Sequence, residues 1–196
     1  HIPFWAYDPR YPDCVGDHRN ALTQTIDLAP TILDYFGLPL PEDMQGHLLT
    51  ARIVSDQPVR EASLYGVMGG QVNVTDARYV YMRAPVTEDN TPLFEYTLMP
   101  THMNKMFSPK ELQQWEKVEG FSFMNGCQVM QIPSRTLRPL LSLETPMGRG
   151  RMTTLLFDVE TDPGQLSPVG DLVVEARMIK LMLREMARNE CPSEQY

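Results

Sequence analysis

The sequence has 196 residues, 42% of them hydrophobic, and a formal net charge of −8 at pH 7. A chain of this length and composition can bury a sizeable core as one or two domains. The acidic balance argues against a general nucleic-acid or anionic-membrane surface, because phosphate groups are bound by clustered cations. No apolar run approaches the length of a membrane span, and no secretory signal is recognisable. We therefore expect neither nucleic acid nor a membrane as a partner. The sequence does not indicate where in or outside the cell the protein is located.

The N-terminal stretch from His1 to Tyr7 is rich in strand-forming residues and stops at the turn signal Asp8-Pro9. We expect it to form one strand of a larger sheet. The three cysteines lie far apart, and no C-x-x-C pair indicates zinc binding or a redox motif. These residues, which we interpret as ordinary thiols, are Cys14, Cys127 and Cys191.

A short helix is predicted to begin at about Leu28. Asp27 can cap it by accepting a hydrogen bond from the amide of Ala29, and Pro30 falls in the first turn, where a missing N–H costs nothing. Gly37 supplies the permissive backbone that ends the helix. Its apolar residues recur at helical spacing and are Leu28, Ile32, Leu33 and Phe36.

From Val59 the pattern changes to short strands, which favours an antiparallel meander. The three predicted strands are Ala62 to Val67, Gln71 to Val74 and Tyr79 to Arg83, with turns at Gly69-Gly70 and Thr75-Asp76-Ala77. Leu93 to Leu98 is a further strand. Ser108 and Glu111 form a capping-box pattern that predicts a helix to about Val118. Residues 121–132 are predicted to be irregular or strand, and residues 133–151 match no clear pattern.

The last predicted strand is Met152 to Val159, and a turn at 161–164 leads to a helix from about Leu172 to Asn189. One stripe of this helix is apolar and should cover a sheet. It consists of Leu172, Ala176, Ile179, Leu183 and Met186. A second stripe is basic and is interpreted as a solvated face. It consists of Arg177, Lys180, Arg184 and Arg188.

The stretch that begins at Ala21 combines an Asp-x-x-Pro-Thr helix, a Gly, a Leu-Pro-x-Pro pattern and an x-Gly-His-x-Leu pattern. The residues concerned are Asp27, Pro30, Thr31, Gly37, Leu38, Pro39, Pro41, Gly46, His47 and Leu49. This order resembles the segment of sulfatases that follows the last metal-binding motif of their catalytic domain. An Asp-His pair, Asp17 and His18, also occurs. In sulfatases such a pair lies before the strand that corresponds to His1–Tyr7 and is followed by Gly, whereas here it lies after that strand and is followed by Arg19. We therefore interpret it as part of a solvated loop.

Two further stretches resemble the same family. Residues 155–171 are similar to its closing phrase, Leu-Tyr-Asp-Leu-x-x-Asp-Pro-x-Glu-x-x-Asn-Leu, with departures at Phe157, Gln165 and Pro168. Residues 69–83 and 95–103 are similar to one bacterial group of these enzymes. The resemblance implies an α/β (α+β) fragment: the last strand and helix of a mixed α/β sheet domain, residues 1–58, followed by a small antiparallel subdomain with a long C-terminal helix, residues 59–196.

Sulfatases cleave sulfate esters with a formylglycine, made from the Cys or Ser of a C/S-x-P-x-R motif, and with a calcium ion that holds the sulfate oxygens. None of the three cysteines has this context, and no acidic cluster has the metal-binding context. We therefore predict no cofactor, no metal ligand and no catalytic residue in this chain. The resemblance implies that calcium and formylglycine belong to a full-length parent. A phosphatase or phosphodiesterase of the same superfamily, or a non-catalytic binding or assembly module, is the alternative.

Thr101 and His102 are the candidate substrate-binding residues, because they follow a strand and Pro100 fixes the bend. The resemblance implies that loops of the C-terminal subdomain line the substrate entrance, so His102 would donate to a sulfate oxygen or a sugar hydroxyl. The alternative is that His102 bonds a backbone carbonyl. Asn73 and Thr75 are weaker candidates, since such residues usually serve the adjacent turn.

The expected partners are the missing N-terminal part of the same protein and a sulfated small molecule or glycan. If residues 1–7 and the helix after Asp27 pack on strands outside this sequence, the chain alone has an uncovered apolar face. We then expect it to self-associate, or to be ordered only beside the missing half of the protein.

Overall fold

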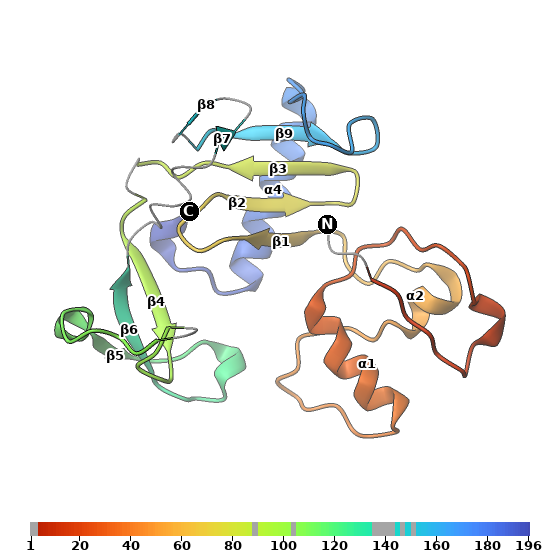
Figure 1. Ribbon diagram of the computed structural model, residues 1–196, viewed down its shortest axis with the longest axis horizontal. Coiled ribbons are helices and arrows are strands. Elements are labelled where there is room, and N and C mark those ends of the chain that lie inside the picture. Colours follow the sequence, from red (N-terminus) through yellow and green to blue (C-terminus); the bar gives the residue numbers. More distant parts are fainter. Residues whose placement is uncertain (1–3, 88–89, 103–104, 135–143, 146–147, 150–151) are drawn as a thin grey trace. The chain divides into compact units, whose positions relative to one another are not determined.

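The computed structural model describes residues 4–87, 90–102, 105–134, 144–145, 148–149 and 152–196. The chain divides into two compact units, His1–Glu61 and Ala62–Tyr196. Helices and small antiparallel sheets make up the fold, so the expected α+β class is confirmed (Figure 1). The identification of the two parts with segments of a sulfatase stays a prediction.

The first unit is built from short helices and loops. These helices are η1 (Pro12–Cys14), η2 (Thr25–Asp27), α1 (Leu28–Tyr35) and α2 (Thr50–Ser55). α1 begins where the sequence predicts. Gly37 ends it with a positive φ of 67°, and its amide donates to the carbonyl of Asp34 at 3.0 Å.

The predicted first strand does not form among residues 4–7, and residues 1–3 lie outside the described residues. Phe4, Trp5 and Tyr7 are exposed, with 85% of Trp5 accessible to solvent. A strand needs a neighbour to pair its backbone groups, and none of the described strands belongs to this unit. For this chain, the prediction of a strand at residues 4–7 is therefore wrong.

The second unit contains a four-stranded antiparallel sheet with the order β1-β2-β3-β9. Its strands are β1 (Ser63–Gly66), β2 (Val72–Thr75), β3 (Tyr79–Arg83) and β9 (Leu155–Asp158). The three predicted meander strands and the last predicted strand are confirmed. Gly69 makes the first turn possible with a φ of 75°, a conformation that costs glycine little. The register places Val74 opposite Tyr81, and Val80 opposite Phe157.

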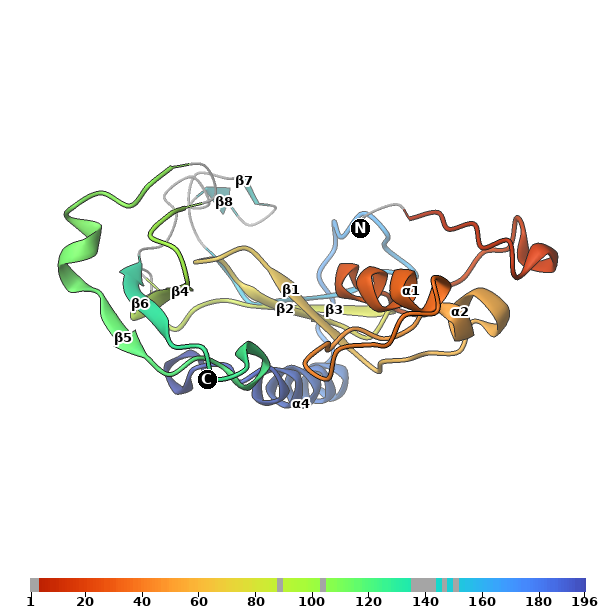
Figure 2. The same cartoon turned by 90° about the horizontal axis from the view of Figure 1, so that it is seen from below.

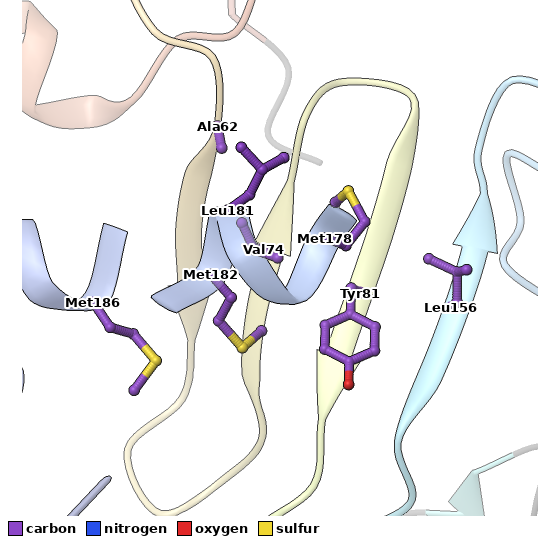
Figure 3. Packing of buried hydrophobic residues seen from close by; sticks show 8 residues of the cluster. All are labelled: Ala62, Val74, Tyr81, Leu156, Met178, Leu181, Met182 and Met186. Carbon is purple, nitrogen blue, oxygen red and sulfur yellow. The ribbon is translucent and has the colours of Figure 1, made fainter. Parts of the chain in front are cut away.

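One long helix, α4 (Leu172–Arg188), packs on one face of this sheet (Figure 2). Asp171 caps it by accepting hydrogen bonds from the amides of Val173 and Val174 at 2.9 and 3.1 Å. The helix and sheet side chains meet in one apolar core (Figure 3). Its buried members are Ala62, Val74, Tyr81, Leu156, Met178, Leu181, Met182 and Met186.

The predicted apolar stripe of α4 is wrong in part. Met186 is buried as expected, but Leu172 is 80% exposed and Leu183 is also exposed. The buried side of the helix instead carries Met178, Leu181, Met182, Glu185 and Met186. The predicted basic residues of the helix are exposed or half-exposed.

A three-stranded antiparallel sheet and several short elements complete the described part of the second unit. The sheet has the order β4-β6-β5, with β4 (Leu93–Thr97), β6 (Val129–Ser134) and β5 (Glu116–Val118). The short elements are η3 (Glu111–Gln114), η4 (Ser122–Met124), the pair β7 (Glu144–Thr145) and β8 (Gly148–Arg149), and η5 (Ser193–Gln195). The helix predicted to reach Val118 is therefore wrong beyond Gln114, because the segment turns extended at Trp115 and pairs with β6.

Candidate functional site

Thr101 and His102 lie in a tight connection after β4. Thr101 forms an isolated bridge with Met106, and the amide of His102 donates to the carbonyl of Lys105 at 2.8 Å. The amide of Phe107 donates to the carbonyl of Pro100 at 3.0 Å, which closes the turn. The backbone therefore holds His102 in place in a turn that follows β4.

The imidazole of His102 lies between two carboxylates. Its Nε2 is 2.8 Å from Oε1 of Glu111, and its Nδ1 is 3.4 Å from Oε2 of Glu95. The ring also packs edge-on against Phe107, with 4.3 Å between the ring centroids. In its protonated form the imidazole donates to both carboxylates at once. The sequence left open a second possibility, in which this ring donates to a backbone carbonyl. No such hydrogen bond of the ring is found among the described residues.

Glu111 is held from a second direction by the capping box that the sequence predicts. The amide of Ser108 donates to Oε2 of Glu111 at 2.6 Å, and the amide of Glu111 donates to the hydroxyl of Ser108 at 3.4 Å. The hydrogen bonds from Ser108, followed by the one from His102, lower the pKa of Glu111 from 4.5 to about 2. The carboxylate beside His102 is therefore ionised at neutral pH.

The two carboxylates beside His102 affect a sulfate oxygen and a sugar hydroxyl, the two groups that we expected His102 to bind, in different ways. A sulfate oxygen would approach a ring flanked by two acidic side chains, Glu95 and Glu111, and charges of the same sign repel. A neutral hydroxyl has no such penalty and can donate to a carboxylate. The geometry therefore favours a sugar or alcohol hydroxyl over a sulfate oxygen at this position.

The weaker candidates Asn73 and Thr75 lie on β2, which belongs to a different sheet from β4. The hydroxyl of Thr75 accepts a hydrogen bond from the amide of Ala77 at 3.1 Å and so serves the β2–β3 turn. Oδ1 of Asn73 is buried and has no hydrogen-bond partner among the described residues.

A polar cluster around Asp27 was not anticipated, and we call it the Asp27 hub. The side chain is fully buried, and its two oxygens accept four hydrogen bonds. Two come from the guanidinium of Arg60 at 2.6 Å each, one from the amide of His47 at 2.9 Å and one from the amide of Gln24 at 2.8 Å. The expected cap on the amide of Ala29 does not form, because these donors occupy the carboxylate.

The donors of the hub also fix the charge of Asp27. Burial by itself raises the pKa of this carboxyl, but the hydrogen bonds from Arg60 and from the amides of His47 and Gln24 outweigh that effect. The pKa of Asp27 consequently lies below its ordinary value. A buried carboxylate is tolerated here because it is paired and fully hydrogen-bonded.

Several other residues that carry the sulfatase resemblance pack around this hub. The hydroxyl of Thr31 donates to the carbonyl of Asp27 at 2.6 Å and accepts from the amide of Leu49 at 2.9 Å. A Cβ at Gly46 would collide with the carbonyl of Ile26, so only glycine fits there. In this chain, the pattern from Asp27 to Leu49 therefore encodes a structural cluster.

Potential metal ligands do not cluster among the described residues. None of them form a group of three or more His, Cys, Asp or Glu that could hold a metal ion. Cys14, Cys127 and Cys191 are free thiols. No described helix has the length and apolar character that crossing a membrane requires.

An open hollow of about 400 Å³ lies elsewhere in the second unit. Its walls come from the β1–β2 hairpin, β4 and the C-terminal segment, and include Tyr65, Met68, Phe94, Tyr96 and Glu194. Thr101 and His102 are not among the lining residues, so the hollow is separate from the predicted substrate-binding residues.

No protein-family model matches this sequence, and a comparison with curated proteins finds no relative.

Proposed function

We propose that this chain is the C-terminal part of a sulfatase-like hydrolase that cleaves sulfate monoesters, with the nucleophile and the metal ligands upstream of His1. The proposal starts from three stretches of sequence that resemble the family and occur in its order. They are Ala21 to Leu49, residues 69–83 with 95–103, and residues 155–171.

The observation that supports the proposal most is the arrangement of residues 155–171. This phrase forms β9, the turn after it and the cap of α4. The carboxylate of Asp162 accepts hydrogen bonds from the amides of Leu166 and Ser167 at 2.7 and 2.8 Å, and Asp171 caps the helix. The result is an antiparallel sheet with one long helix packed on it, which is the subdomain that the resemblance implies.

The chain's own residues then have two roles in the proposed enzyme. The Asp27 hub fixes α1, whose apolar side chains Ile32 and Phe36 are exposed and available to pack on the catalytic sheet. The carboxylates of Glu95 and Glu111, which hold His102 between them, accept a hydrogen bond from a hydroxyl of the substrate. Calcium and formylglycine would be supplied by the upstream part of the parent.

Assays of the full-length parent test this proposal. Purified parent should release sulfate from an aryl sulfate, and calcium removal should abolish the reaction. Residues 1–196 alone should be inactive with or without calcium, because no nucleophile for the covalent step is present. Faster cleavage of the matched aryl phosphate or phosphodiester would favour the phosphatase alternative. Inactivity of the parent toward all of these esters would favour a non-catalytic module, and calcium-dependent turnover by the chain alone would contradict the proposal.

A further inference from the structure

The open hollow of the second unit has the dimensions of a small-molecule site. Its volume of about 400 Å³ lies within the range of roughly 300–1,000 Å³ that such sites occupy. The hairpin between β1 and β2 contributes Gly66, Gly69 and Gly70 to its wall. These residues bring no side chain with them, so the space beside the hairpin stays open. A small organic ligand can therefore enter this hollow from solvent.

Three aromatic rings line the hollow. Phe94 and Tyr96 are two positions apart on β4, so their side chains leave the same face of the strand. The hydroxyl of Tyr96 accepts a hydrogen bond from Nε2 of Gln131 at 3.0 Å, and its ring packs edge-on against Phe121 with 5.0 Å between the centroids. Tyr65 enters from β1 and is 44% exposed. One ring is thus fixed from two sides, and another offers accessible surface to a ligand.

The C-terminal segment adds a negative charge to the wall. Among the described residues that line the hollow, Glu194 is the only one with a charged side chain. Its Oε2 accepts a hydrogen bond from the hydroxyl of Ser193 at 3.2 Å, and the carboxylate forms no ion pair with a described residue. The side-chain amide of Gln195 donates to the carbonyl of Pro92 at 2.9 Å and so ties this segment to the entry of β4. The hollow therefore combines aromatic rings with a carboxylate that has no counter-charge among the described residues.

We propose that this hollow binds a small organic cation of the quaternary ammonium class. The face of an aromatic ring is negative and attracts a cation, and the attraction increases when water is excluded. The carboxylate of Glu194 attracts a cation further and repels an anion. A quaternary ammonium has no N–H donors to satisfy, which suits a wall made mostly of apolar and aromatic residues. Because His102 lies outside the hollow, the proposal does not depend on the proposed function.

The methionine methyl signals of the full 196-residue chain, labelled with ¹³C and observed by NMR, test the proposal. Met68 lines the hollow, and Met178 lies in the core between α4 and the sheet. One signal therefore reports on the hollow and the other on the fold. Choline is the probe, and sodium chloride keeps the ionic strength constant. The Met68 signal should shift to saturation with a dissociation constant on the order of 1 mM, while the Met178 signal should stay in place.

An uncharged analogue separates the effect of charge from the effect of shape. In 3,3-dimethylbutan-1-ol a carbon replaces the nitrogen of choline, and the other non-hydrogen atoms are the same. This alcohol loses the attraction to the rings and to the carboxylate but keeps the apolar contacts. It should bind about tenfold more weakly than choline.

Two substitutions separate the ring from the carboxylate. Tyr65→Leu should weaken choline binding about two- to fivefold, and Tyr65→Phe, which keeps the ring, should bind as the natural chain does. Glu194→Gln should weaken binding about threefold. Glu42→Gln, at an exposed glutamate of the first unit, changes the net charge equally and should have no effect.

Three results would overturn the proposal. If the Met68 signal does not move with choline up to about 50 mM, or roughly fifty times the expected dissociation constant, the hollow binds no such cation. If 3,3-dimethylbutan-1-ol binds as tightly as choline, the hollow selects apolar bulk and not charge. If Tyr65→Leu and Glu194→Gln both bind as tightly as the natural chain, choline binds elsewhere. Should the Met178 signal show that Tyr65→Leu has lost its fold, Glu194→Gln and the alcohol decide between these outcomes.

Discussion

In the first unit the most buried side chain is a carboxylate, Asp27, whereas in the second unit the most buried side chains are apolar, with Val74 and Met178 fully enclosed. The first unit also exposes Ile32 and Phe36 on α1, with 68% of Phe36 accessible. The second unit covers one face of its main sheet with α4. One unit is thus organised by a charged pair and the other by an apolar core.

This difference indicates whether each unit is stable by itself or needs another surface to cover its apolar side chains. An apolar core gains stability from burial within the unit itself. A buried ion pair gains little net stability and serves mainly to fix one geometry, so the first unit keeps its shape while leaving an apolar face uncovered. We therefore expect the second unit to be self-sufficient and the first to need a covering surface.

The largest expected effect comes from breaking the ion pair of the first unit. Asp27→Asn removes the charge that compensates Arg60, which has a side chain only 6% exposed. Removing one partner of a buried pair lowers the free energy of unfolding by about 3–5 kcal/mol. The loss should appear as faster amide exchange over residues 1–61. The control Asp17→Asn affects an exposed pair with Arg19 and should cost under ~1 kcal/mol. Unchanged exchange in Asp27→Asn would mean that the hub does not organise this unit.

Truncating the apolar core should destabilise the second unit in a comparable way. Met178→Ala removes a side chain with no exposed surface and should cost about 2–5 kcal/mol in free energy of unfolding, because a cavity is left behind. Amide exchange over residues 62–196 measures the loss, and the first unit should not respond. Leu183→Ala, on an exposed side of the same helix, is the control. Equal losses in both variants would remove the distinction between core and surface on α4.

Polar substitution on α1 tests whether its exposed face causes association. The double variant Ile32→Ser and Phe36→Ser should weaken self-association of the chain about tenfold, or ~1.4 kcal/mol, in sedimentation experiments. The control replaces Leu172 and Val173, both 80% exposed in the second unit, by serine and should have no such effect. A natural chain that is monomeric at all concentrations would contradict the interpretation of an uncovered face.

Acid should loosen one polar cluster of the second unit. The folded-state pKa of Glu111, about 2, lies below its ordinary value of 4.5. A depressed pKa means that the ionised form stabilises the fold, so this contribution is complete above about pH 4.5 and is lost as the pH falls towards 2. Exchange of the Ser108 amide should rise over that range. Glu111→Gln should flatten the profile, and an unchanged profile in that variant would assign the acid effect to other groups.

The smallest effect on stability is expected at His102. In the full-length parent, His102→Ala should lower kcat/KM for the natural substrate and leave the melting temperature nearly unchanged, since partly exposed ion pairs contribute about 0–1 kcal/mol. His18→Ala, at an exposed loop histidine, should change neither quantity. Activity that falls only in step with the melting temperature would make His102 structural, and would show that polar pairs also hold the second unit together.

Local patterns predicted those elements that local chemistry determines. The start of α1, the β1–β3 meander and the length of α4 follow from turn residues, periodicity and caps that are close in sequence. The Asp27 hub was missed because Arg60 and His47 lie 33 and 20 residues away along the chain. No local rule links them to a residue that also fits the pattern of a helix cap.

A second error also arises from long-range packing, and a third arises from the residue composition of α4. The capping box at Ser108 was predicted correctly, but pairing with β6 draws Glu116–Val118 into a strand and ends the helix early. On α4, the buried stripe contains Glu185, whose carboxylate accepts hydrogen bonds from Arg184. A charged residue within the buried stripe made the neighbouring apolar stripe look more regular than the true one.

The pairing of β3 with β9 has a consequence for how this chain tolerates change in length. The two strands are antiparallel neighbours, and Met82 lies opposite Leu155, yet the whole of residues 84–154 runs between them. The entropy cost of closing a loop grows only slowly with its length. The long connection between β3 and β9 therefore lowers the stability of the sheet only a little. β9 must nevertheless wait for this closure, whereas β1–β3 can form from near neighbours. Changes in the length of this connection should therefore cost the sheet beneath α4 little closure entropy.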